Sequence, residues 1–214
     1  MKQVTMDILT AYKKKYQFMS EMEKQILDAF CVLDYSYQQG GKLLICGNGG
    51  SNSDADHIAG ELLKGFNKKR SLTEKEKEFF YQFGDMGREL AEKLQGSLPA
   101  INLGAHSSLI TAVINDIGGE EVFAQQVMGL GTEKDVLLGI STSGNSKNVV
   151  KAIMAAKLKG MKIIGLMGNK KGKMMEYCDV AIEAPSGCTP DIQDMHTPVY
   201  HVLCAMLETE RWAV

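Results

Sequence analysis

The sequence predicts an α/β fold: a doubly wound parallel sheet of five strands with helices on both faces, which gives three layers. Three observations support this prediction. Short apolar runs of strand length recur along the chain, longer amphipathic helical patterns lie between them, and two of the apolar runs end in polar, glycine-rich loops. Strands buried on both faces show continuous apolar runs, and their alternation with helices is typical of a parallel sheet.

The chain begins with a predicted long N-terminal helix over residues 3–38. Apolar side chains such as Ile8, Leu27 and Leu33 recur at helical spacing, with Lys and Glu between them. The glycine pair at 40–41 ends this helix. A helix of this length extends beyond the edge of its own domain, so we expect it to contact a partner subunit.

The remaining elements alternate regularly. The predicted strands are residues 42–46, 98–103, 135–140, 162–167 and 178–184. The predicted helices are residues 52–65, 107–115, 119–128, 146–159 and 190–212. The sequence contains no internal repeat, low-complexity tract or clear linker, so we expect residues 1–214 to form a single domain.

A charged insertion over residues 67–96 interrupts this alternation. Thr73 and Glu76 have the spacing of a capping box, which predicts the start of a helix. Aromatic and Leu residues give the segment a partial apolar face, whereas Gly84 and Gly87 weaken the helical pattern. The insertion is therefore predicted to be one helix or a pair of helices.

Composition narrows the class of protein. The hydrophobic fraction of 44% and the charged fraction of 23% are ordinary for a globular protein, and the formal net charge of −2 argues against nucleic-acid binding spread over the whole chain. No apolar run approaches a membrane helix, and the N-terminus lacks the apolar core of a signal peptide. From the charge and the apolar runs we therefore expect no direct nucleic-acid partner and no membrane partner. The odd number of cysteines, without CxxC spacing, predicts reduced thiols in a cytoplasmic protein.

Two of the predicted strands end in loops that open helices. The first loop reads Gly47-Asn48-Gly49-Gly50-Ser51, and the second reads Ser141-Thr142-Ser143-Gly144-Asn145-Ser146. The N-terminus of a helix offers free backbone N–H groups and a partial positive charge, which suit an anion. Hydroxyl groups add donors without a full charge. These features predict a site for the phosphate of a small molecule that binds and leaves.

Alternatively, both loops are simply capped helix starts, since Ser, Asn and Gly are common there. The three successive hydroxyl residues of the second loop, followed by Ser146, exceed what capping needs. Neither loop is a P-loop or a dinucleotide-binding fingerprint, because the required Lys-Ser/Thr ending and GxGxxG pattern are absent. If the strand order is 2-1-3-4-5, both loops face one crevice at the carboxyl ends of the strands.

The candidates for acid–base chemistry are few, because the chain has only four histidines. His57 and Glu61 lie four residues apart and share one face of a predicted helix. His201 lies near the last helix, with Gln193 upstream. A carboxylate and a neutral imidazole could move a proton between C1 and C2 of a sugar phosphate through an enediol, or could bind zinc. Alternatively, His57 and Glu61 are an exposed helix pair of small energetic weight.

One difficulty concerns Gln193 and His201 as ligands of a common metal ion. Their spacing on a straight helix corresponds to about 12 Å of rise and roughly 80° of rotation. Two explanations remain open. Pro198 could kink the helix between them, or different subunits could supply the two groups.

The motifs together resemble the sugar isomerase (SIS) domain, and most closely its sedoheptulose-7-phosphate (phosphoheptose) isomerase subfamily. The resemblance rests on GNGGSxxDAxHxxxE at 47–61, on DVLLGISTSGNS at 135–146, and on TPDIQDMH at 189–196, which is similar to the subfamily's TPRIQExH. A downstream histidine, His201, completes the pattern. The resemblance covers nearly the whole chain.

This resemblance implies a flavodoxin-like core and a homotetramer with active sites at subunit interfaces. It implies Glu61 as the general base, His201 as the partner acid or base, and one zinc ion per subunit. The matching zinc ligands are His57, Glu61, Gln193 and His201. The matching sugar and phosphate contacts are Asn48, Gly49, Gly50, Ser51, Asn115, Asp116, Ser141, Thr142, Ser143, Ser146 and Gln193.

The sequence also departs from the subfamily. Asn52 and Ser53 stand where His-Cys is frequent, Asp191 and Asp194 replace Arg and Glu, and Gly65 replaces an Arg. These changes surround the expected sugar, so isomerisation of another sugar phosphate stays an alternative.

A second alternative comes from another class of protein. Segments 109–116 and 122–131 are similar to a non-catalytic SIS regulator that binds the replication initiator DnaA. The resemblance implies that the regulator lacks the carboxylate at the Glu61 position and the histidine at the His201 position. This chain has both residues, which a scaffold does not need. An etherase acting on N-acetylmuramic acid phosphate fits less well, because its family has a longer chain and different acidic residues. The sequence thus favours an enzyme.

Overall fold

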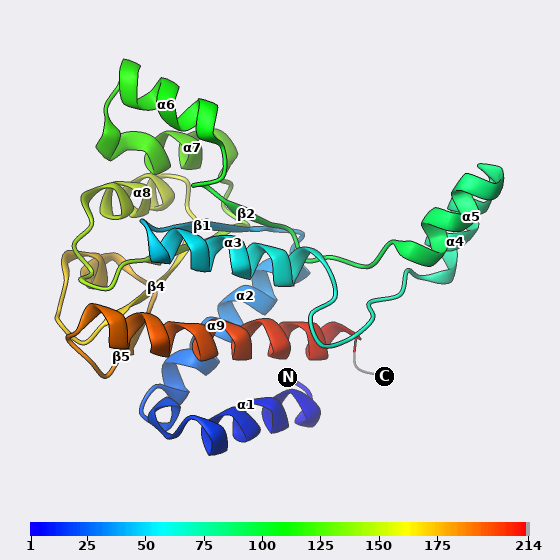
Figure 1. Ribbon diagram of the computed structural model, residues 1–214, viewed down its shortest axis with the longest axis horizontal. Coiled ribbons are helices and arrows are strands. Elements are labelled where there is room, and N and C mark those ends of the chain that lie inside the picture. The colour runs from blue at the N-terminus through cyan, green and yellow to red at the C-terminus, as the bar shows by residue number, and fades with distance from the viewer. Residues whose placement is uncertain (213–214) are drawn as a thin grey trace.

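The computed structural model describes residues 1–212, which form a three-layer α/β structure around one parallel sheet (Figure 1). The strands are β1 (Leu43–Cys46), β2 (Ala100–Asn102), β3 (Val136–Ile140), β4 (Lys162–Gly168) and β5 (Val180–Ala184). Their order is β2-β1-β3-β4-β5, and every neighbouring pair is parallel. The predicted fold class and strand order are confirmed.

Helices cover both faces because the strand side chains alternate between two apolar cores. Leu43 and Ile45 of β1 belong to one core, and Leu44 and Cys46 belong to the other. The first core lies under α2 (Glu23–Gln38), α3 (Gly50–Leu63) and α9 (Thr189–Trp212). The second lies under α7 (Val122–Leu130) and α8 (Lys147–Leu158), with α6 (Ser107–Asp116) outside them (Figure 1). Short 3-10 turns η2 (Gly119–Glu121) and η3 (Lys173–Tyr177) connect the elements on this second side.

The prediction of one continuous N-terminal helix is wrong, because the structure has two helices with a break between them. Helix α1 (Gln3–Lys15) ends at Tyr16, whose φ of −121° and ψ of 84° are not helical, and the 3-10 turn η1 (Gln17–Ser20) leads into α2. Leu9 of α1 and Ile26 of α2 are both fully buried in the same core. The break lets both halves pack against α9 of their own chain, which a straight helix cannot do.

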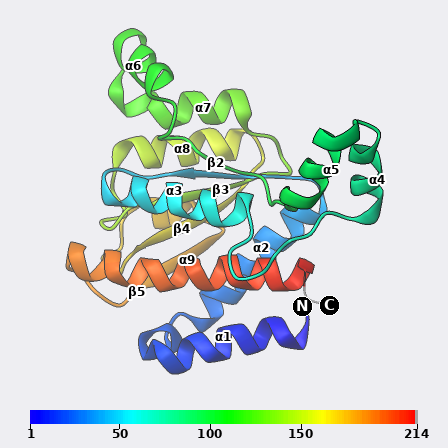
Figure 2. The ribbon, with the colours of Figure 1, turned by 45° about the vertical axis from the view of Figure 1, so that its right-hand side comes forward.

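The insertion forms a pair of helices, the second of the two predicted alternatives. Thr73 and Glu76 form the expected capping box at the start of α4 (Glu74–Tyr81), and α5 (Gly84–Lys93) packs back on it. This helical pair, residues 73–94 and here called the arm, stands away from the body in both views (Figure 2). Its base is closed by an antiparallel bridge between Ser71 and Gln95.

The arm leaves large apolar side chains in contact with solvent. Phe79, Phe83 and Met86 are 56%, 61% and 77% exposed. A separate finding concerns membranes: within residues 1–212 no helix combines the length and apolar character that crossing a bilayer requires.

Candidate active site

The two polar loops lie next to each other at the carboxyl ends of β1 and β3. These strands are paired, with Cys46 opposite Gly139. The side-chain amides of Asn48 and Asn148 exchange two hydrogen bonds of 2.9 and 2.8 Å, which tie the first loop to the start of α8. The two loops therefore lie side by side at this edge of the sheet.

The second loop surrounds the N-terminus of α8 with hydroxyl groups. The hydroxyls of Ser141 and Ser146 are 2.9 Å apart, and Ser143 is exposed. Gly144 has a φ of +64°, and a Cβ there would lie 3.1 Å from the Cα of Gly172, so only glycine fits without strain. Backbone N–H groups and hydroxyls that converge at a helix start suit a phosphate group.

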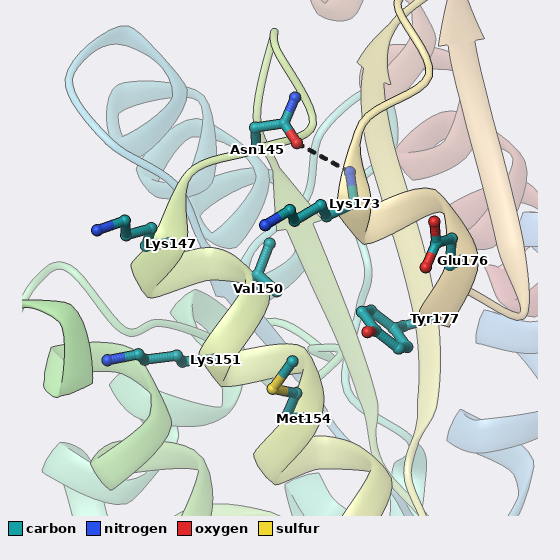
Figure 3. A pocket seen from close by; sticks show the side chains of 8 residues that line it. All are labelled: Asn145, Lys147, Val150, Lys151, Met154, Lys173, Glu176 and Tyr177. Atoms are coloured by element: carbon teal, nitrogen blue, oxygen red, sulfur yellow. Dashed lines mark hydrogen bonds between the residues drawn. The ribbon is translucent and has the colours of Figure 1, made fainter.

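A cavity of about 550 Å³ lies beside this loop, between α8 and η3 (Figure 3). The side-chain oxygen of Asn145 accepts a 3.0 Å hydrogen bond from the backbone N–H of Lys173, which braces the loop against η3. Lys147 and Lys151 also line the cavity, but they pair with Glu120 at 2.9 and 2.8 Å. The charges of these two lysines are therefore compensated by neighbouring carboxylates.

The first loop opens onto a shallower cavity of about 310 Å³, which Asn48, Asn52 and Ile114 help to line. Helix α6 forms the opposite wall. Asn115 and Asp116, at the end of this helix, are exposed, and the amide of Asn115 donates a 2.7 Å hydrogen bond to Asp116. The predicted sugar contacts on the first loop and on α6 thus lie on the same side of the molecule.

Gln193 belongs to α9, and its side chain reaches the start of α3. Its side-chain nitrogen would be 2.5 Å from a Cβ at position 50, so the glycine at this position makes room for it. Glu61 is eleven residues after Gly50 on α3, which corresponds to a rise of about 16 Å. Gln193 and Glu61 of one chain are therefore at different ends of α3, and Pro198 does not bend α9 enough to bring them together.

Three predicted residues do meet near the end of α3. Nε2 of His57 and Nε2 of His201 each lie 3.1 Å from Oε1 of Glu61. The ligand atoms of all three lie within 4.8 Å of one another. Helix α3 supplies His57 and Glu61 at a spacing of one turn, and α9, which packs against α3, supplies His201.

Burial shapes the electrostatics of this cluster. The Glu61 side chain is 6% exposed, and burial raises the pKa of its carboxyl group, although the nearby His57 acts in the opposite direction. Oε2 of Glu61 is buried without a hydrogen-bond partner. Burial, His57 and Lys15 all lower the pKa of His201, which favours the neutral imidazole. The cluster therefore places a carboxyl group of raised pKa beside an imidazole whose neutral form is favoured.

A residue that the sequence did not indicate as part of the site, Tyr200, orients His57. The Tyr200 hydroxyl lies 3.1 Å from Nδ1 of His57. This contact occupies Nδ1 and turns Nε2 toward Glu61. Burial raises the pKa of Tyr200 to about 12, so its hydroxyl keeps its proton. The position of Tyr200 beside His201 in the sequence was the only available signal.

The other two histidines stay outside this cluster. His196 is fully buried, and burial lowers its pKa to about 4. His106 is exposed at the start of α6.

Comparison with known proteins identifies the family. The SIS-domain profile matches residues 75–168. A phosphoheptose isomerase from Helicobacter pylori strain P12 is 43% identical over 198 residues, which cover 92% of this chain and 88% of the relative. A phosphoheptose isomerase from Rhodospirillum rubrum is 43% identical over 183 residues, covering 86% of this chain and 84% of the relative.

Solved structures agree. A phosphoheptose isomerase from Francisella tularensis has a TM-score of 0.74 and 30% identity, covering 98% of this chain and 100% of the other. The corresponding enzyme from Neisseria gonorrhoeae has a TM-score of 0.71 and 30% identity, covering 97% and 100%. With its sheet order, its paired loops and this similarity along nearly its whole length, the chain belongs to the phosphoheptose isomerase family of SIS-domain proteins.

Proposed function

We propose that this enzyme interconverts sedoheptulose 7-phosphate and D-glycero-D-manno-heptose 7-phosphate. The observation that carries the proposal is the contact of a buried Glu61 carboxylate with His201 in a chain that also holds a hydroxyl-rich loop at a helix start. The relatives, which are phosphoheptose isomerases, support the same substrate. Isomerisation of another sugar phosphate is the second candidate, favoured by the departures around the sugar.

The proposed reaction moves one proton between neighbouring carbons. The Glu61 carboxylate removes a proton from C1 of the ketose, and the electron pair of that bond forms the C1–C2 double bond of an enediol. His201 passes a proton to O2 as the C2 carbonyl becomes a hydroxyl. Glu61 then returns its proton to C2 while His201 takes the proton from O1, which yields the aldose. The raised pKa of Glu61 strengthens it as a base.

The cluster also fits a zinc ion. Two imidazoles and a carboxylate are ligands that zinc accepts, Oε2 of Glu61 lacks a hydrogen-bond partner, and Tyr200 leaves Nε2 of His57 turned inward. We infer that His57, Glu61 and His201 of one chain would hold the ion, with Gln193 as a fourth ligand from a second copy. Such an ion would polarise the sugar oxygens during isomerisation.

Metal removal tests this inference. Metal analysis of the purified protein is expected to give about one zinc per chain, because three ligands of one chain converge. Dialysis against a chelator is expected to abolish turnover, and added zinc should restore it. A His57→Ala variant should lose the zinc, whereas His106→Ala should keep it. Full activity in a metal-free sample would remove zinc from the proposal.

We further propose a homotetramer in which neighbouring subunits share each active site. Two features support it. Gln193 and the cluster around Glu61 lie at different ends of α3 within one chain, and the His57 side chain is 51% exposed and open to a neighbouring subunit. The apolar side chains of the arm add surface that an assembly could cover. Light scattering of the purified protein gives the subunit number directly.

Mixed assemblies test whether the site is shared. Glu61→Gln chains keep the second loop (141–146) intact, whereas Gly144→Val chains disrupt that loop and keep the acid–base cluster. If each site combines both parts from different chains, equal co-expression should restore about a quarter of the wild-type activity by random association. Assemblies of Glu61→Gln with His201→Ala chains are the control and should stay inactive, because one chain supplies both residues. Equal inactivity of both mixtures would place the site within one chain.

A direct assay decides between the enzyme and its alternatives. Ketose and aldose phosphates are incubated with the protein, with and without zinc, and followed by NMR. Conversion of sedoheptulose 7-phosphate is expected, with exchange of one carbon-bound hydrogen for solvent deuterium. Turnover of a different sugar phosphate alone would favour the second candidate. If no sugar phosphate reacts, binding to DnaA becomes the next measurement.

We also infer a cytoplasmic location. All five cysteines are free thiols, as expected in a reducing compartment. Fractionation of cells that express the tagged protein would test this inference.

A further inference from the structure

A completely buried ion pair lies at the base of the arm. Arg70 and Glu208 both have side chains with 0% exposure, and Nε of Arg70 donates a 2.8 Å hydrogen bond to Oε1 of Glu208. The guanidinium carbon also lies 4.8 Å from the centre of the Trp212 ring. A buried ion pair is often no more stabilising than apolar side chains of similar size, so its contacts must be considered individually.

Arg70 holds the end of the helix that carries the proposed base. Its two terminal nitrogens donate hydrogen bonds of 2.7 and 2.6 Å to the backbone carbonyls of Glu61 and Leu62. Helix α3 ends there, because Lys64 is extended, so these carbonyls lack helical partners. A cation at a helix C-terminus also interacts favourably with the helix dipole. Arg70 therefore fixes the backbone position of Glu61 itself.

Glu208 connects the same point to the proposed acid–base histidine. It belongs to α9, two turns after His201, and its carboxylate accepts 2.8 Å hydrogen bonds from the backbone N–H groups of Phe66 and Asn67. The Phe66 ring lies against the His201 ring, with centres 5.6 Å apart and planes 31° from parallel. Glu208 thereby places the ring that packs on one side of His201.

We propose that Arg70 and Glu208 are positioning residues that set the Glu61 carboxylate and the His201 imidazole at their working separation. One carboxylate and one guanidinium hold α3, the segment after it and α9 at a single point. Neither side chain reaches solvent or a bound sugar, so neither is a catalytic residue. The proposal rests on the acid–base assignment of Glu61 and His201 given above.

The main test replaces both charges at once. The double variant Arg70→Met/Glu208→Leu leaves no unpaired buried charge, which protects the fold. The expected result is a folded protein whose kcat for sedoheptulose 7-phosphate falls by about 10- to 100-fold, with KM changed by less than about threefold. Arg70→Lys, a milder change, keeps the charge but cannot reach all three acceptors, so kcat should stay low there as well.

A second measurement does not depend on activity. With isotopically labelled histidine, NMR reports the ring protons of the four histidines separately. The His201 signals are expected to shift in both variants, because the Phe66 ring moves relative to it, while the His106 signals stay in place. The NMR measurement still tests positioning if the wild-type enzyme turns over no sugar phosphate. That absence of turnover would contradict the proposed function instead.

The Lys42–Asp135 pair offers a matched control. Asp135 is 2% exposed, pairs with Lys42 at 2.7 Å, and accepts hydrogen bonds from two backbone N–H groups, as Glu208 does, but at the amino ends of β1 and β3. Lys42→Met/Asp135→Leu should alter Tm without changing kcat or the His201 signals. The positioning proposal is overturned if the Arg70 variants keep wild-type kcat and histidine signals, or if both pairs reduce kcat equally at matched Tm.

Discussion

Replacing Glu61 with Gln is expected to reduce kcat for sedoheptulose 7-phosphate by about 10²- to 10⁴-fold, the usual contribution of a general base. The amide keeps an oxygen that can accept hydrogen bonds from His57 and His201, but it cannot accept the C1 proton. KM should change little, because the loop at 141–146, which is proposed to bind the phosphate, is untouched. Single-substrate kinetics followed by NMR or a coupled assay measures both constants.

The same substitution should leave the fold as stable as before, or more so. Burial disfavours the Glu61 carboxylate, and a neutral amide avoids that cost. Thermal unfolding of the Glu61→Gln variant therefore separates a lost base from a damaged fold. Glu133→Gln, an exposed change before β3, serves as the control and should match the wild type in kcat. A Glu61→Gln enzyme with near-wild-type kcat would falsify the assigned mechanism.

Periodicity and turn chemistry predict most of the fold. The five strands occur where the apolar runs lie, and the capping box at Thr73 is present in the arm. The break at Tyr16 was not predictable, because the helical pattern of apolar residues continues through it. Only the packing of both halves on α9 favours the break, and that packing depends on tertiary structure.

The site was predictable to different degrees. The two loops follow from glycine and hydroxyl patterns, and the one-turn spacing of His57 and Glu61 follows from helix geometry. The contact with His201 needed the family resemblance, because nothing local in the sequence joins α9 to α3. Arg70 follows Lys68 and Lys69, so its sequence context looks like a solvated basic run, although the side chain is fully buried.

His196 is the buried histidine that the proposed mechanism does not use, and it makes stability depend on pH. Burial lowers its pKa from 6.5 to about 4 in the folded protein. Below pH 6.5 the unfolded chain takes up a proton at this position and the folded chain does not, so unfolding becomes easier. The loss grows as the pH falls from 6.5 and levels off near 4, where the folded form also binds the proton. Its full size is about 3 kcal/mol.

A His196→Leu variant should remove this dependence. Between pH 7 and pH 4 the free energy of unfolding of the wild type is expected to fall by about 3 kcal/mol more than that of the variant. Urea unfolding followed by circular dichroism, at one fixed protein concentration, measures the difference. Burial also raises the pKa values of Glu61 and Asp54, but their contributions to the pH dependence are present in both proteins and largely cancel. His106→Leu makes the same change at an exposed site and should follow the wild type. If the free energy of unfolding changes with pH equally in His196→Leu and the wild type, His196 takes up its proton as readily in the folded protein as in the unfolded chain, which contradicts the prediction.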